Sequence, residues 1–253
     1  MKAVFTCGGT GGHINPALAV ARVLLERRPD SEILFVGAED GMEATLVPRE
    51  GFRLETLQIS SYMRSLKPSA IRHNVRAALS IRRALKKADR IIRDFQPDVI
   101  LGTGGYASYP MLHEGARLGI PTAVHESNAV PGLATKMVAD KVDRILVSFA
   151  DSRSAYRDPS RVIAVGMPVR EEFVFPRRAD ARRALGLDEK TPMIVSAWGS
   201  LGAREMNKKI AQFMKLECEQ DCWRHIHATG SFGWRWMPDY VKEQGVELEK
   251  HPL

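Results

Sequence analysis

The sequence has few cysteines, few aromatic residues and no long hydrophobic run. Its three cysteines, Cys7, Cys218 and Cys222, are too few and too unevenly placed for a disulfide framework, which is typical of a reducing compartment. No stretch reaches about 18 uninterrupted apolar residues, and the N-terminus becomes glycine-rich too early for a signal peptide or membrane anchor. We therefore expect a cytoplasmic protein.

A metal site is also not expected. Cys218, Cys222, His225 and His227 are close in sequence, but they lack the paired two-residue spacings of structural zinc sites. The same stretch is typical of a helix end followed by a short strand.

Negative charge is in deficit, since 30 acidic residues face 37 lysines and arginines, and the net charge is +7. This balance favours anionic partners. Nucleic acid is not expected, because the aromatic residues do not interleave with the basic ones as a stacking platform requires.

The region between Tyr62 and Arg93 contains many basic residues and few acidic ones, and we expect this region to attach to an anionic membrane surface. The alternative is a solvated helix face. The basic residues are Arg64, Lys67, Arg72, Arg76, Arg82, Arg83, Lys86, Lys87, Arg90 and Arg93.

Short β-branched runs alternate with stretches of helical periodicity along most of the chain. This alternation predicts an α/β fold with a parallel sheet and crossover helices. A first helix is expected from about Pro16, because Leu18, Ala21 and Leu24 form an apolar stripe, and a second near Met42. The predicted strands are KAVFT, EILFV, DVILG, TAVHE, RILVS and RVIAV.

The pattern breaks near Gly166 into GMPVREEFVFPRR, which contains two prolines. We predict a Rossmann-like domain over residues 1–165, a linker over 166–176 and a partial second domain over 177–253. The second domain is expected to contain a strand at PMIVSAWGS, a helix from about Ala203 and a strand near HIHAT. So few strands are unusual for an independent doubly wound sheet.

The segment from Cys7 to His13 places four glycines in five positions between the first strand and the first helix. Glycines let backbone amides approach a ligand, and a helix N-terminus favours phosphates. The alternative is a tight strand-to-helix turn. The dinucleotide fingerprint is not matched, because Ile14 stands where its third glycine belongs, and no Gly-Lys-Ser or Gly-Lys-Thr completes a P-loop.

Three more clusters follow predicted strands. Residues 102–108 follow DVILG, residues 125–128 follow TAVHE, and the glycine-rich segment 199–204 lies in the second domain. Because the carboxyl ends of parallel strands share one edge of a sheet, we expect residues 7–13, 102–108 and 125–128 to border one cleft. His125 and Glu126 could instead simply end a buried strand.

Several long motifs, in register, identify a family. GGTGGHINPALAVA, GTGGYASYP, HESNAVPGLATK, VGMPVREE and GSLGARE occur in this order. Together they resemble the MurG family of bacterial cell-wall glycosyltransferases, from about Lys2 to Gly230. The resemblance implies a GT-B fold, in which the N-terminal domain binds the acceptor and the C-terminal domain binds UDP-N-acetylglucosamine. It implies inverting transfer of N-acetylglucosamine to the 4-hydroxyl of the N-acetylmuramoyl unit of lipid I, an undecaprenyl-diphosphate acceptor. The resemblance also implies that the reaction takes place at the cytoplasmic face of the membrane and needs no metal and no cofactor.

The resemblance also implies roles for individual residues. His13 is the candidate base that removes the acceptor hydroxyl proton, since a neutral imidazole can accept a proton near pH 7. Glu126 is a second candidate for a base or an orienting group. The acceptor diphosphate is assigned to Gly9, Thr10, Gly11, Gly12, Gly104 and Gly105. Tyr106 and Asn128 match positions near the acceptor cleft, and Arg170, Ser200 and Gly202 match positions on the donor side.

The chain departs from the family pattern in two places. Trp198 precedes Gly199 and Ser200 where the family has a second glycine, and the indole is expected to narrow the donor side. The family's uridine-binding and sugar-binding segments also lie beyond the position of Leu253, so we expect these 253 residues by themselves not to turn over. The alternative function is a non-catalytic module that binds lipid I without a working donor site.

Overall fold

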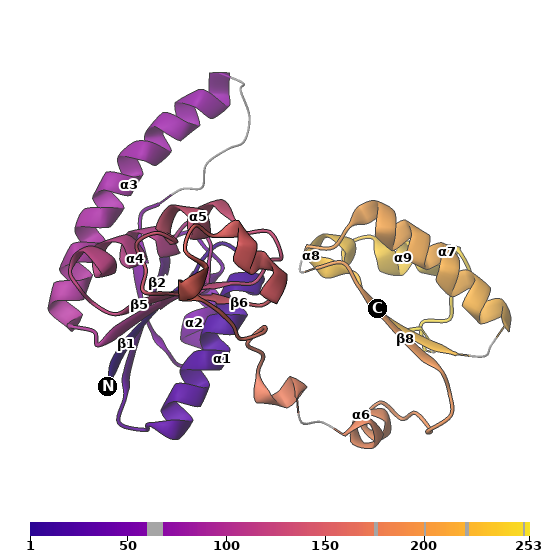
Figure 1. The fold of residues 1–253 in the computed structure, drawn as a ribbon. Helices are drawn as coiled ribbons and strands as arrows, with labels where there is room; N and C mark the ends of the chain where they lie inside the picture. Colours follow the sequence, from indigo (N-terminus) through magenta and orange to yellow (C-terminus); the bar gives the residue numbers. More distant parts are fainter. Residues whose placement is uncertain (60–67, 175–176, 200, 221–222, 250) are drawn as a thin grey trace. The chain divides into compact units, whose positions relative to one another are not determined.

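The computed structural model describes residues 1–59, 68–174, 177–199, 201–220, 223–249 and 251–253, and of residues 68–79 and 172 it describes only the backbone. The chain divides into two compact units, Met1–Val174 and Phe175–Leu253, which are considered separately (Figure 1). Most of the segment predicted as a linker, from Gly166 to Val174, belongs to the first unit.

The first unit is built on a parallel sheet with strand order β3-β2-β1-β4-β5-β6-β7. The predicted strands are confirmed, and the prediction missed β3, whose sequence RLETL is half polar because the strand lies at the edge of the sheet. The strands are β1 Lys2–Thr6, β2 Glu32–Ala38, β3 Arg53–Leu57, β4 Val99–Gly102, β5 Thr122–Glu126, β6 Arg144–Val147 and β7 Val162–Ala164.

Helices cover both faces of this sheet, which is why its inner strands are apolar on both sides. Along β1, Ala3 and Phe5 pack in a cluster with Ile14 of α1, whereas Val4 packs in a second cluster with Ile92 of α3. The helices are α1 Gly11–Arg27, α2 Glu43–Arg49, α3 Pro68–Phe95, α4 Ser108–Arg117 and α5 Leu133–Val138, with 3₁₀ turns η1 Ala150–Ala155, η2 Pro159–Arg161 and η3 Glu171–Phe173. Within the described residues, no helix is both long enough and apolar enough to cross a bilayer.

The strand order reverses direction at β1, which pairs with β2 on one side and with β4 on the other. The loops that follow β1 and β4 therefore leave the same edge of the sheet at a topological switch point, where open α/β sheets bind ligands. This topology brings two glycine-rich segments together that are about a hundred residues apart in the sequence.

The second unit contains a short parallel sheet formed by β8 and β9, in which β9 contacts α7, and α7 in turn contacts α9. Its apolar core includes Met214, Met237 and Val241. Across the two strands, Ser196 Oγ of β8 lies 2.7 Å from both Nε2 of His225 and Nδ1 of His227 in β9. The elements are α6 Arg178–Ala184, β8 Met193–Ala197, α7 Arg204–Gln220, β9 Arg224–Ala228, α8 Gly230–Gly233 and α9 Met237–Glu243.

Candidate functional site

The two glycine loops of the first unit touch each other. Gly105 has a φ of +81°, and a Cβ atom there would lie 2.1 Å from the carbonyl oxygen of Gly8. A Cβ atom on Gly104, with φ +101°, would lie 2.8 Å from Cδ2 of His13. Side chains at these positions would force the loops apart, so glycine is required both for the backbone conformation and for the contact. Gly104, Gly105 and His13 are thus brought together as the sequence predicted.

His13 lies in the first turn of α1 with its ring orientation fixed by the backbone. Its Nδ1 is 3.0 Å from the carbonyl oxygen of Gly8 and 3.3 Å from Oγ1 of Thr10. Because a carbonyl oxygen can only accept, the neutral imidazole carries its proton on Nδ1. Nε2 then holds the lone pair, and it lies on the side of Gly104. The arrangement presents His13 as a proton acceptor at the cavity described below.

The helix α1 begins at Gly11, five residues before the predicted start at Pro16, and this shift matters for the site. Thr10 is the N-cap residue with extended backbone, so Gly11 and Gly12 form the first turn of a helix that continues to Arg27. Backbone amides in the first turn of a helix point outward along its axis and favour an anion. The predicted positions Thr10, Gly11 and Gly12 therefore form a helix N-terminus beside His13.

Glu43 is a buried residue of this site that the sequence analysis missed. Its side chain is fully buried, and its carboxylate accepts hydrogen bonds from the amide of Ala38 at 2.7 Å and the amide of Gly9 at 3.1 Å. The amide of Gly9 is therefore engaged within the protein. Burial, together with the charges of Glu43 and Asp40, raises the pKa of Tyr106, whose ring packs over Gly9. A glutamate directly after a predicted strand and loop gave no distinctive motif in the sequence.

Glu126 ends β5 and is buried, and its two carboxylate oxygens are occupied. Oε1 accepts hydrogen bonds from the backbone amide and the side-chain amide of Asn128 at 2.9 and 2.8 Å, and Oε2 accepts from the amide of Gly132 at 2.9 Å. Burial by itself would raise the pKa of Glu126, but these bonds and one with Thr135 outweigh it and lower the pKa. This environment favours an orienting role, since the carboxylate holds Asn128 and the start of α5.

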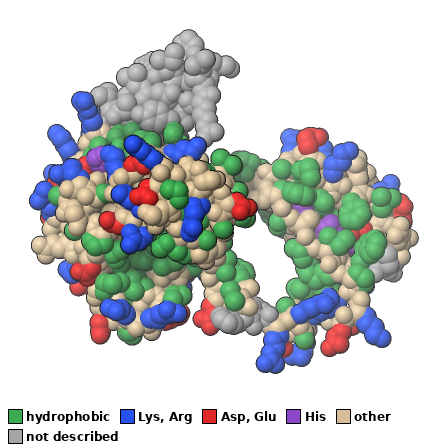
Figure 2. Space-filling model, viewed as in Figure 1, with side chains coloured by type: hydrophobic (Ala, Val, Ile, Leu, Met, Phe, Trp, Pro, Cys, Tyr) green, Lys and Arg blue, Asp and Glu red, His purple; other side chains and the backbone are tan. Residues whose placement is uncertain are grey.

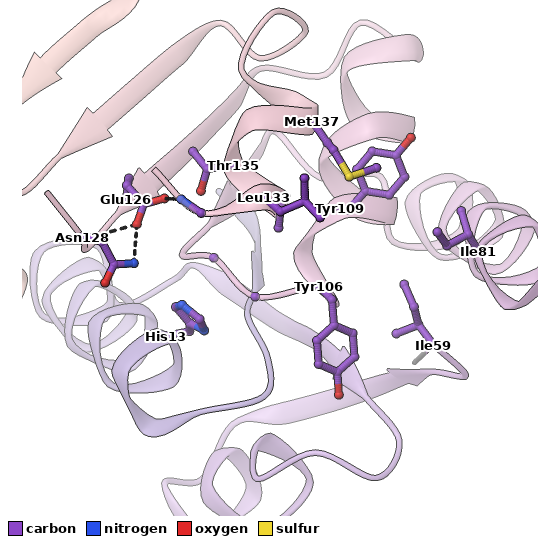
Figure 3. Close-up of a pocket in the computed structure, with 14 residues that line it drawn as sticks. His13, Ile59, Ile81, Tyr106, Tyr109, Glu126, Asn128, Leu133, Thr135 and Met137 are labelled. Carbon is purple, nitrogen blue, oxygen red and sulfur yellow. Dashed lines mark hydrogen bonds between the residues drawn. The ribbon is translucent and has the colours of Figure 1, made fainter. Parts of the chain in front are cut away.

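His13, the loop at Gly104 and Gly105, and Glu126 with Asn128 border one cavity of about 300 Å³ within the first unit. The predicted residues from Gly9 to Gly12 do not line this cavity. His13, Glu126 and Asn128 lie at one end, and Tyr106 and the glycine loop lie in the middle (Figure 3). The other end is apolar. The cavity therefore joins a polar region with a candidate base to a region without charged groups. The lining residues are His13, Ile59, Ile81, Gly104, Gly105, Tyr106, Tyr109, Glu126, Asn128, Gly132, Leu133, Ala134, Thr135 and Met137.

The residues predicted for the donor side lie elsewhere. Arg170 lines a separate cavity of the first unit, with its guanidinium 3.9 Å from the carboxylate of Glu50 and over the ring of Phe173. Ser200 lies outside the described residues. Gly202, in the second unit, has a φ of +77°, and a Cβ atom there would lie 2.1 Å from the carbonyl oxygen of Thr229.

His125, considered as a cleft residue, is instead buried at the end of β5. Its Nε2 lies 3.0 Å from the carbonyl oxygen of Gly166 and 3.3 Å from Oγ of Ser148. Burial lowers its pKa, which keeps the imidazole neutral. The alternative reading of His125 as a strand-end residue is the better description.

Comparison with known proteins gives the family. Residues 3–147 match the glycosyltransferase family 28 N-terminal domain. The chain is 40% identical over 250 residues to the UDP-N-acetylglucosamine–N-acetylmuramyl-(pentapeptide) pyrophosphoryl-undecaprenol N-acetylglucosamine transferase of Thermoanaerobacter sp. (strain X514), covering 99% of this chain and 67% of that protein. It is 39% identical over 230 residues to the transferase of the same name from Acetivibrio thermocellus, covering 91% of this chain and 61% of that protein. The chain thus spans between 61% and 67% of the length of these relatives.

Solved structures share the fold. The crystal structure of MurG from Acinetobacter baumannii has a TM-score of 0.65 at 22% identity, covering 96% of this chain and 65% of that chain. A UDP-GlcNAc 2-epimerase from Neisseria meningitidis has a TM-score of 0.63 at 13% identity, covering 99% of this chain and 71% of that chain. These likenesses confirm the GT-B fold that the motifs predicted.

Proposed function

The chain belongs to the MurG family within glycosyltransferase family 28, and from this we propose that it transfers N-acetylglucosamine from UDP-N-acetylglucosamine to lipid I. The observation that carries the proposal is the position of His13, whose proton-free Nε2 lies beside Gly104 in a cavity lined also by Asn128. The first unit is the acceptor-binding part in this proposal.

The proposed chemistry is a single displacement. The 4-hydroxyl oxygen of the N-acetylmuramoyl unit attacks the anomeric carbon of the donor, the bond from that carbon to UDP breaks, and the configuration inverts. His13 Nε2 takes the hydroxyl proton, and the Gly8 carbonyl holds the ring through Nδ1. Glu126 acts through Asn128, which it orients by two hydrogen bonds.

We assign the acceptor diphosphate to the start of α1, where Gly11 and Gly12 form the first turn, and to the adjoining loop at Gly104 and Gly105. Backbone amides and the helix dipole supply the positive potential there. Gly9 was assigned to the diphosphate by resemblance, but its amide donates a hydrogen bond to Glu43. We assign it to the support of the loop.

On the donor side, Gly202 and Ser200 remain the proposed contacts of the UDP diphosphate. The close approach of Gly202 to the backbone of Thr229 supports a compact loop before α7, which begins at Arg204. Arg170 would have to leave Glu50 and Phe173 to reach a donor.

We further propose that the protein acts at the cytoplasmic face of the membrane and attaches peripherally through α3. The predicted region Tyr62–Arg93 lies partly outside the described residues. In its described part, the side chains of Arg82, Arg83, Lys86 and Lys87 are exposed, and Figure 2 shows lysine and arginine side chains standing out from this part of the first unit. Such residues are attracted to anionic lipid.

The proposal is tested by titrating the chain with a soluble lipid I analogue in a calorimeter. We expect binding to the chain and its loss in Gly105→Ala, because the new Cβ atom would meet the Gly8 carbonyl at 2.1 Å. Gly51→Ala is the matched control, since Gly51 has a similar φ of +83° but no atom within 4 Å of the new Cβ. Absence of binding to the unmodified chain, or equal binding by both variants, would contradict the proposal.

A further inference from the structure

The apolar end of the cavity in the first unit has no part in the chemistry proposed above. Five apolar or aromatic side chains from four segments line this part of the cavity. In Figure 3, Ile59 and Ile81 lie on the side of Tyr106 away from His13, and Leu133, Tyr109 and Met137 lie above Tyr106. Ile59 follows β3, Ile81 is in α3, Tyr109 is in α4, and Leu133 and Met137 are in α5.

Two of these side chains are open to solvent. Leu133 is 54% exposed and Met137 is 40% exposed, although both lie on the short helix α5, whose Val138 is buried in the core. Exposed large apolar side chains that line a cavity together indicate a surface that a ligand covers.

Charge also distinguishes this end of the cavity. Of the described residues that line the cavity, Glu126 alone carries a full charge, and its carboxylate is bonded to Asn128 and Gly132 at the opposite end. An occupant of the apolar end gains from burial of apolar surface and meets no ionic group. The polar end adjoins the first turn of α1 through His13, and a helix N-terminus suits an anion.

From this continuity we propose that the apolar end binds the first isoprenyl units of the acceptor lipid, directly beyond its diphosphate. The inference rests on the proposed function for the identity of the lipid. A cavity of about 300 Å³ holds on the order of ten water-sized groups, so one or two five-carbon units enter and the rest of the lipid remains outside. Leu133 and Met137 are then contacts of the lipid.

The test measures binding of inorganic diphosphate, geranyl diphosphate and n-decyl diphosphate to the chain by calorimetry, in detergent-free buffer. We expect geranyl diphosphate to bind at least about tenfold more tightly than inorganic diphosphate, because burial of each CH₂ favours binding. If n-decyl diphosphate gains as much affinity over inorganic diphosphate as geranyl diphosphate does, the site accepts any apolar chain. If n-decyl diphosphate gains less affinity, the site is shaped for the branched chain. Both results support a lipid subsite.

Substitutions locate the effect. Leu133→Gln and Met137→Gln should each remove most of the gain from the lipid chain and leave the affinity for inorganic diphosphate within about twofold. The matched control is Val130→Gln, because Val130 is 75% exposed near α5 and does not line the cavity. An undiminished gain in Leu133→Gln and Met137→Gln, or no gain in the unmodified chain, would overturn the inference.

A further comparison separates this inference from the proposed function. A soluble lipid I analogue that lacks any lipid reports on the head-group site alone. If it does not bind while geranyl diphosphate binds in a way that depends on Leu133, the lipid subsite stands and the proposed acceptor is wrong. If it binds while the lipid gain is absent, the proposed function stands and the subsite is wrong.

Discussion

The carboxylate of Glu43 accepts a hydrogen bond from the backbone amide of Gly9 at 3.1 Å, across 34 residues of sequence. The same carboxylate accepts from the amide of Ala38 at 2.7 Å and is fully buried. Cβ atoms on Gly8, Gly37 or Gly41 would collide with this side chain. The buried carboxyl group of Glu43 thus supports the glycine loop before α1, which leaves the amides at the start of the helix for the ligand proposed above.

Removal of this carboxylate should loosen the loop. Glu43→Ala leaves the buried amide of Ala38 and the partly buried amide of Gly9 without acceptors and opens a cavity, and we expect the free energy of unfolding of the first unit to fall by roughly 2 to 4 kcal/mol. Glu43→Gln should cost less, because one oxygen remains to accept from Ala38. Urea denaturation followed by far-UV circular dichroism measures the loss, and hydrogen exchange at Gly9 measures the loosening. Unchanged exchange at Gly9 in both variants would contradict the support role.

His13→Ala should affect chemistry more than folding. In a full-length context, with UDP-N-acetylglucosamine and a soluble lipid I analogue, we expect turnover to fall by about 10² to 10⁴, the usual contribution of a general base. Thermal stability should change little, because within the part of the chain that the structure describes the half-buried ring makes its hydrogen bonds to the Gly8 carbonyl and Thr10. Asn15→Ala, at an exposed position on the same helix, is the control. Normal turnover in His13→Ala would remove this histidine as the base.

The second unit should lose stability in mild acid. Burial lowers the pKa values of His227 and His251 in the folded chain, so the unfolded chain takes up protons first as the pH falls below about 6.5. Stability contributed by these neutral imidazoles is fully present above that pH and decreases toward pH 5. Glu217, whose carboxylate lies 3.9 Å from His251, opposes the shift of His251 but does not reverse it.

Tryptophan fluorescence can follow this unit alone, because Trp198, Trp223, Trp234 and Trp236 all lie within it. We expect the urea midpoint of the fluorescence transition to be lower at pH 5 than at pH 7.5, and the difference to shrink in His251→Leu. A midpoint independent of pH would show that these histidines do not control the stability of the unit.

Membrane attachment should depend on the basic face of α3. The double substitution Arg83→Glu and Lys87→Glu should weaken co-sedimentation with anionic vesicles by about tenfold or more, since each such residue contributes on the order of 1 kcal/mol. Lys215→Glu with Lys242→Glu makes the same change in net charge on exposed positions of the second unit and should have little effect. Binding that resists high salt, or that both doubles weaken equally, would argue against attachment through α3.

The sequence by itself determined the class of fold and the family. Alternation of apolar strands with helical stretches required a parallel sheet, and the glycine motifs after DVILG and before His13 were long enough to identify relatives. It also predicted that the segments with His13 and with Gly104 and Gly105 border one cleft, because loops that follow parallel strands leave one edge of the sheet. These inferences depend on periodicity within single segments and on the order of the segments along the chain, and both can be read from the sequence.

The tertiary structure alone decided which groups remain available for function. The sequence could not show that Glu43 engages the Gly9 amide, that Glu126 is saturated by Asn128 and Gly132, or that Arg170 lies against Glu50. Likewise, the apolar end of the cavity joins residues from segments far apart in the chain, such as Ile59 and Met137. Hydrogen-bond partners and cavity walls depend on which distant side chains pack together, and no local pattern in the sequence encodes that choice.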